Sequence, residues 1–198
     1  MQSIDSKILS RIYGRGKGCV ATPGDFLDLG SRQAIDLALH RLVKKGTLRR
    51  LTRGLYDYPR IDPDLGLVSP TIDAVAKALK GRDNIRLQPS GGYAANLLGL
   101  SEQVPAKVVF FTDGPARRIQ LGKQVIIFKH TTPRAMATAG RVSGLVIQAL
   151  RYLGRKHIDD SIIAWLQKQL KDNEKRQLLY DIRNAPAWIA AIIRRIVK

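Results

Sequence analysis

The chain has 198 residues, and its 34 Lys and Arg against 16 Asp and Glu give a net charge of +18. So large a cationic excess favours a polyanionic partner, of which nucleic acid is the commonest, although a basic surface kept for solubility remains the alternative. The single cysteine, Cys19, excludes an intrachain disulfide and a cysteine-based zinc site. We expect neither a metal nor another cofactor, because His130 and His157 lack neighbours at metal-ligand spacing.

Two features of the sequence bear on location. The residues that follow Met1 do not combine a charged segment with an apolar one, so no secretory signal is expected. The most apolar stretch, residues 185–197, is interrupted by Pro186, Arg194 and Arg195 and is too short to span a bilayer. We therefore expect a cytoplasmic protein with no membrane partner.

Two amphipathic helices are predicted near the N-terminus. The first covers residues 3–13, with Ser3 as N-cap. The second covers residues 32–45, between an N-cap at Ser31 and a C-terminal glycine at Gly46. Its apolar stripe has the helical spacing i, i+3, i+4 and i+7, and consists of Ile35, Ala38, Leu39 and Leu42. A short helix through Phe26 ahead of it would complete a helix-turn-helix.

Directly after Gly46 come two β-prone runs, residues 47–51 and 55–58, which indicate a hairpin. Three arginines surround its turn: Arg49, Arg50 and Arg53. They would repel one another without an anionic partner. A helix-turn-helix followed by a basic hairpin is typical of a winged helix that enters a DNA groove.

In this motif the start of the second helix reads base edges, while its flanks and the wing contact phosphate. The predicted base-reading residues are Ser31, Arg32, Gln33 and Asp36. Arginine suits guanine and glutamine suits adenine. The predicted backbone contacts are His40, Arg41, Lys44, Arg49, Arg50, Arg53, Arg15 and Lys17. For each of them a solvated outer face is the alternative.

Arg15 and Lys17 belong to the glycine-rich segment G-R-G-K-G, residues 14–18. This segment lacks the G-K-[ST] ending of a phosphate-binding loop and does not follow a strand, so no nucleotide site is expected there. A plain connector between secondary-structure elements is the simpler interpretation, with contact to DNA backbone as the other.

Residues 59–63, P-R-I-D-P, read as a linker between a winged helix-turn-helix domain at 1–60 and an α+β domain at 61–198. The second domain is predicted to contain a helix at 70–79, a short strand at 85–88 and one or two helical turns up to Gly99. Further strands at 107–112, 117–121 and 124–130 predict a small antiparallel sheet. From Ser143 onward a C-terminal helical bundle is expected, with helices at 145–153, 158–170, 173–182 and 186–197.

A second basic surface is predicted on or beside that sheet, formed by Arg117, Arg118, Lys123, Lys129 and Arg134. It is either a partner surface or a solvated sheet face whose charges protect an edge. Asp113 follows a buried strand, as a nuclease metal ligand would, but no second clustered carboxylate accompanies it. We therefore expect no enzymatic activity.

The segment G-S-R-Q-A-I-D-L-A-L-H-R-L-V-K-K-G-T-L-R-R-L-T-R-G-L-Y-D-Y-P, residues 30–59, resembles the AbiEi family of antitoxins from abortive-infection toxin-antitoxin loci, which act in phage defence. Looser similarity continues through P-S-G-G-Y-A-A-N-L-L-G-L and K-V-V-F-F-T-D-G. The resemblance implies a winged helix that represses its own operon at inverted repeats. It also implies a C-terminal domain that helps neutralise a nucleotidyltransferase-type toxin, without need of a stable complex.

The leading hypothesis is therefore a DNA-binding autorepressor and antitoxin. It would bind double-stranded operator DNA as a monomer or as a dimer assembled on the DNA, because no heptad seam predicts a stable dimer. The alternative is an RNA- or toxin-binding neutraliser in which the winged helix is mainly a scaffold.

Overall fold

The computed structural model describes residues 3–103 and 105–198. Within them the fold is α+β, with eight α-helices and nine short strands in three sheets. The chain forms two compact units: one runs from the N-terminus to Asn84 and includes Ile119–Lys123, and the other comprises Ile85–Arg118 and Gln124–Lys198. The first unit thus extends past residue 60, where the linker was predicted.

The first unit begins with two helices that are capped as predicted. Helix α1 (Ile4–Arg15) starts after Ser3, whose hydroxyl accepts a hydrogen bond from the Ser6 N–H. Strand β1 (Val20–Ala21) and the 3-10 helix η1 (Pro23–Phe26) follow. Helix α2 (Arg32–Lys44) starts after Ser31, whose hydroxyl accepts from the Ala34 N–H. The two caps confirm the predicted starts of both helices.

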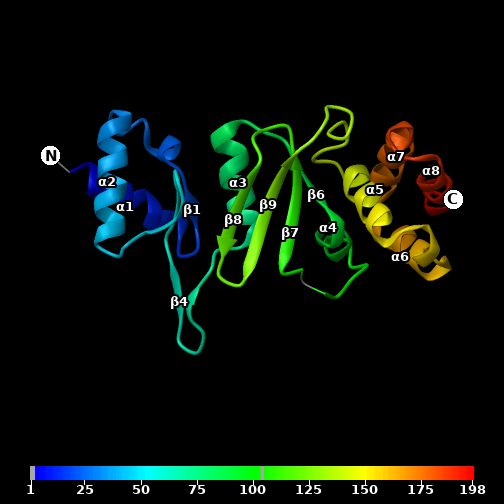
Figure 1. Cartoon of the computed structure of the whole chain (residues 1–198), viewed down its shortest axis with the longest axis horizontal. Coiled ribbons are helices and arrows are strands. Elements are labelled where there is room, and N and C mark those ends of the chain that lie inside the picture. The colour runs from blue at the N-terminus through cyan, green and yellow to red at the C-terminus, as the bar shows by residue number, and fades with distance from the viewer. Residues whose placement is uncertain (1–2, 104) are drawn as a thin grey trace. The chain divides into compact units, whose positions relative to one another are not determined.

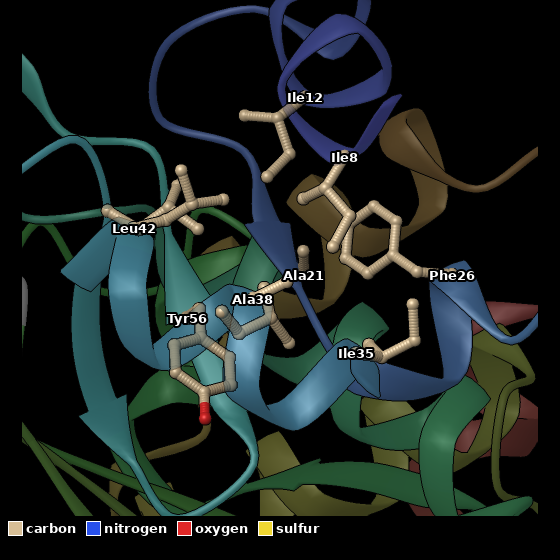
Figure 2. Close-up of a cluster of buried hydrophobic side chains, with 10 residues drawn as sticks. Ile8, Ile12, Ala21, Phe26, Ile35, Ala38, Leu42 and Tyr56 are labelled. Atoms are coloured by element: carbon tan, nitrogen blue, oxygen red, sulfur yellow. The ribbon is translucent and has the colours of Figure 1, made fainter. Parts of the chain in front are cut away.

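Apolar side chains from these elements form one core (Figure 2). Ile8 and Ile12 of α1 meet Phe26 of η1 and the inner stripe of α2. Burial of apolar surface is the main driving force here, at about 25 cal/mol per Å². Because four residues of α2 are fully buried on one side, the opposite side of that helix is fixed toward solvent.

A three-stranded antiparallel sheet closes this unit, in the order β1-β3-β2. Strands β2 (Arg49–Thr52) and β3 (Leu55–Asp57) form the predicted hairpin. The chain reverses directly after α2, since the N–H groups of Thr47 and Leu48 both donate to the Leu42 carbonyl. Tyr56 of β3 packs into the core beside Ala38 (Figure 2).

The segment expected to be a linker contains a second hairpin instead. Strand β4 (Arg60–Asp62) pairs antiparallel with β5 (Gly66–Val68). Prolines flank β4 on both sides, which made the sequence read as a break. Because neither proline lies inside the strand, the backbone N–H groups of β4 remain available for pairing with β5. Helix α3 (Ile72–Asp83) follows and belongs to the same unit.

The larger sheet has the order β6-β7-β9-β8 and includes β6 (Leu87–Ser90), β7 (Lys107–Thr112), β8 (Arg117–Leu121) and β9 (Gln124–His130). The antiparallel sheet predicted from β7, β8 and β9 is wrong for one pair, because β7 and β9 are parallel. Strand β6, which was not assigned to this sheet, pairs antiparallel with β7. The intervening β8 provides the return that a parallel pair requires. Apolar runs such as those of β7 and β9 suit a buried strand of either orientation, so the sequence did not distinguish the two.

Helices complete the second unit: α4 (Gly91–Leu97), α5 (Val142–Leu153), α6 (Asp160–Gln169), α7 (Asp172–Tyr180) and α8 (Ala187–Ile196), with 3-10 turns η2 (Arg155–His157) and η3 (Asp181–Asn184). The last four helices, drawn yellow to red in Figure 1, share one apolar core. They confirm the predicted helical C-terminal part. Helix α6 begins after Asp159, whose carboxylate accepts a hydrogen bond from the Ile162 N–H.

Candidate nucleic-acid interface

Helix α2 presents two opposite faces. Its buried stripe, Ile35, Ala38, Leu39 and Leu42, is at most 1% exposed. At 100° per residue the opposite side is a line of four exposed side chains, Gln33, Leu37, His40 and Lys44, which we call the outer stripe. None of the four has a hydrogen-bond or ion-pair partner within the described residues, so this stripe is available for a ligand.

The flanks of the outer stripe carry ion pairs. The Arg32 Nε–H donates to Asp36 Oδ2 at 3.0 Å, one helical turn away. Arg41 donates from Nε and Nη2 to Asp5 of α1, at 3.0 and 2.5 Å. This hydrogen-bonded guanidinium lowers the pKa of Asp5. Both arginines are more than half exposed, so these pairs are weak enough to be exchanged for phosphate contacts.

The four predicted base-reading residues therefore lie together at the start of α2. They differ in whether their side chains are free to contact a ligand. The Ser31 hydroxyl is used as the N-cap, and Arg32 and Asp36 are paired with each other. Gln33 is free and exposed. Sequence reasoning missed Leu37, which is 53% exposed. The sequence feature that could have identified Leu37 is an apolar residue outside the buried stripe, four residues after Gln33 and three before His40.

The three arginines of the β2-β3 hairpin differ in whether their side chains have partners. Arg49 makes a bidentate ion pair with Asp57, which is fully buried, and also donates to the Val68 carbonyl at 3.2 Å. Arg49 therefore stabilises the hairpin and does not project from it. Arg50 and Arg53 are exposed and make no hydrogen bond or ion pair through their side chains to any described residue.

Helix α3 contacts the turn of the β2-β3 hairpin. Arg82 Nη1 donates to the carbonyl oxygens of Arg53 and Gly54, each at 3.3 Å, while its other nitrogens bind Asp83. Gly54 has a φ of +69°, a left-handed conformation that favours glycine. The Arg82 side chain thus stabilises the turn that carries Arg53.

The glycine-rich loop at residues 14–18 contributes less. Arg15 Nη2 donates to Asp25 Oδ1 at 3.1 Å and the guanidinium lies 6.0 Å from the centre of the Phe26 ring. Lys17 is exposed and has no partner within the described residues. Cys19 is half-buried, and burial raises the pKa of its thiol, which makes it a weak nucleophile.

The residues of the predicted second basic surface are not placed in one unit. Lys123 belongs to the first unit, whereas Arg117, Arg118, Lys129 and Arg134 belong to the second. Arg118 and Lys129 are exposed on β8 and β9, and Arg117 is half-buried. Arg134 lies in the turns after β9, where it lines a cavity together with Arg151.

Asp113, the carboxylate considered for a nuclease, is held by one neighbour. It accepts hydrogen bonds from the backbone N–H and the Nε–H of Arg86, at 2.8 and 2.7 Å, and Arg86 lowers the pKa of Asp113. Over the part of the chain that the structure describes, no group of three or more His, Cys, Asp or Glu side chains is arranged to hold a metal ion. None of the helices there is both long and apolar enough to cross a membrane.

A protein-family model described as a family of unknown function, DUF6088, matches residues 7–178. The chain therefore belongs to the DUF6088 family. Among solved structures it is similar to the Rv2827c protein of Mycobacterium tuberculosis, with 16% sequence identity and a TM-score of 0.43, covering 97% of this chain and 81% of that one. The comparison with curated proteins returned no match.

Proposed function

We propose that this protein is a DNA-binding transcriptional autorepressor that serves as the antitoxin of an AbiE-like toxin-antitoxin operon. In this proposal the first unit is a winged helix-turn-helix. Its elements occur in the order α1, β1, η1, α2, β2 and β3, with the sheet order β1-β3-β2, which is the arrangement of winged-helix domains. The outer stripe of α2 enters the major groove and the wing lies on the backbone.

One observation carries the proposal: a solvent-facing helix stripe and a braced wing, both with unpaired groups, occur in one unit. The outer stripe provides Gln33, an amide suited to adenine, and Leu37, an apolar group suited to the thymine methyl. Arg50 and Arg53 supply charge for phosphate. Sequence is read by the helix and affinity comes mainly from phosphate neutralisation.

The antitoxin role and the toxin partner rest on the AbiEi resemblance of residues 30–59. The partners are operator inverted repeats and a nucleotidyltransferase-type toxin, which is neutralised without a stable complex. Two copies of the chain meet on the repeat. The proposal includes no catalytic step, in keeping with the engagement of Asp113 by Arg86.

The test measures binding of the purified protein to its own upstream DNA, to a scrambled duplex of equal length and to a tRNA pool, over a salt series. We expect selective binding to the upstream DNA that falls steeply with salt. Arg53→Gln should weaken binding to every duplex and lower the salt slope by about 1. Arg176→Gln, which removes an exposed, unpaired charge from α7, is the matched control.

Two results would overturn this proposal. Equal binding to all three nucleic acids would reduce the first unit to a general polyanion binder. A preference for tRNA would favour the alternative, a neutraliser that binds RNA or the toxin and uses the winged helix as a scaffold.

A further inference from the structure

The second unit contains a cavity of about 290 Å³ whose wall is mostly polar. The turns after β9, one face of α5 and the segment before α8 form this wall. Its polar side chains are Thr132, Arg134, Thr138, Gln148, Arg151 and Asn184. The volume lies just below the range of typical small-molecule sites, which is roughly 300 to 1,000 Å³, and suits a small group.

The charge of the wall has one sign. Arg134 and Arg151 both line the cavity and neither has an ion-pair or hydrogen-bond partner within the described residues. Among the described residues, no carboxylate lines the cavity. Asp181 is the nearest acidic residue along the chain from Asn184. It is 1% exposed and accepts hydrogen bonds from Arg141, Ser143 and Gln177. Asp181 is thus already satisfied and does not neutralise the two arginines.

Gln148 is the second observation that points to a ligand. Its side chain lines the cavity, the residue is 7% exposed, and it makes no side-chain hydrogen bond within the described residues. Its amide atoms remain accessible, because among the described residues Gln88 Oε1 is the one buried side-chain polar atom without a partner. Gln148 lies one helical turn before Arg151 on α5, so both side chains are on the same face of that helix.

The N-terminus of α8 adds a third favourable feature for an anion. Pro186, the N-cap of this ten-residue helix, lines the cavity and provides no side-chain cap hydrogen bond. The first N–H groups of a helix carry a partial positive charge and lack partners inside the helix. Guanidinium groups, an amide donor and a helix N-terminus are a donor set that suits phosphate oxygens.

We propose that this cavity binds a terminal phosphoryl group, carried either by a small nucleotide or by the phosphorylated end of a nucleic acid. Arg134 and Arg151 bind the phosphate oxygens, and the Gln148 amide donates a further hydrogen bond. The site lies in the second unit and does not depend on the DNA-binding role of the first. The second unit would thus bind a ligand other than the DNA that the first unit is proposed to bind.

Isothermal titration of the full chain at constant ionic strength tests the proposal. The probes are AMP, adenosine, a 5′-phosphorylated hexanucleotide and the same hexanucleotide without phosphate. We expect AMP to bind more tightly than adenosine, or the phosphorylated hexanucleotide to bind more tightly than the unphosphorylated one, or both. Arg151→Gln and Gln148→Leu should each lower that affinity about tenfold. Arg176→Gln, outside the cavity, should leave it unchanged.

The outcomes separate the two sources of phosphate. Binding of AMP identifies a small nucleotide, whereas binding of only the phosphorylated hexanucleotide identifies a nucleic-acid end. The proposal fails if phosphorylation does not alter binding, or if Arg176→Gln has the same effect as Arg151→Gln. Thermal unfolding of each variant checks folding. If Gln148→Leu does not fold, Arg134→Gln takes its place, since Arg134 is an exposed side chain.

Discussion

Arg49 and Asp57 face each other across the β2-β3 hairpin, with Arg49 Nε and Nη2 at 3.0 and 2.6 Å from the two carboxylate oxygens of Asp57. Asp57 is fully buried and the Arg49 side chain is 28% exposed. Because Arg49 also donates to the Val68 carbonyl, this pair connects the hairpin to strand β5. Arg49, which is predicted from the sequence to contact the DNA backbone, is therefore engaged in an ion pair that stabilises the hairpin.

Asp57→Ala should lower the free energy of unfolding by about 3 kcal/mol, because it leaves the Arg49 guanidinium without its buried partner. Urea unfolding measures this change. Asp36→Ala is the control, since it removes the exposed Asp36–Arg32 pair and should cost about 0.5 kcal/mol or less. Equal losses in the two variants would contradict a special role for Asp57.

Gly144→Ala should destabilise the second unit by about 1 to 3 kcal/mol or more through overpacking. A Cβ at this position would lie 2.2 Å from Gln88 Oε1 and 2.4 Å from the Thr138 carbonyl oxygen. The first neighbour is a buried side chain and the second is backbone, so neither moves easily. Differential scanning calorimetry should show a lower Tm.

Gly81→Ala is the control for Gly144→Ala, because it makes the same substitution at a helical glycine where the added methyl group has room. Gly81 lies inside α3, and nothing is within 4 Å of its added Cβ. Alanine should therefore raise stability by about 0.5 to 1 kcal/mol through its helix propensity. Stabilisation by both alanines would show that the packing around Gly144 is looser than described.

Asp28 should titrate at unusually low pH. Hydrogen bonds from Arg11, at 2.7 and 2.6 Å, lower the pKa of Asp28 to about 2. The folded-state pKa lies below the ordinary aspartate value of 3.8, so any stability that this pair contributes is present above about pH 4 and lost as the pH falls through about 2. Carboxyl NMR shifts measure the titration directly, and Arg11→Gln should return the pKa toward 3.8. An unchanged pKa in that variant would assign the shift to another group.

The helices were predictable because local signals specify them. Ser3, Ser31 and Asp159 each precede an apolar periodicity and each caps a helix. Strand pairing was harder to predict. Strands β7 and β9 are parallel neighbours because β8, which lies between them in the chain, takes the edge of the sheet beyond β9. That placement is a property of the whole sheet and not of any one segment.

The candidate site was predictable in location but not in the use of each side chain. The outer face of α2 follows from its apolar stripe. The ion pair of Arg41 with Asp5 joins residues 36 positions apart, and that of Arg49 with Asp57 depends on hairpin register. The cavity around Gln148 is assembled from three distant segments, so no local pattern indicated it.

The decisive prediction for DNA reading concerns the outer stripe of α2. Gln33→Ala and Leu37→Ala should reduce discrimination between operator and scrambled duplex, each by about 1 to 3 kcal/mol if the side chain contacts a base. Both residues are exposed, so neither substitution should change stability by more than about 0.5 kcal/mol. Competition binding with single-base operator variants measures the discrimination position by position.

Arg53→Ala provides the contrast within the same unit, because a phosphate contact carries no sequence information. It should weaken operator and scrambled duplex by equal factors and leave discrimination intact. If Gln33→Ala and Leu37→Ala also weakened both duplexes equally, the outer stripe would lie on the backbone and another element would read the bases. If neither variant changed binding at all, α2 would not dock in the groove.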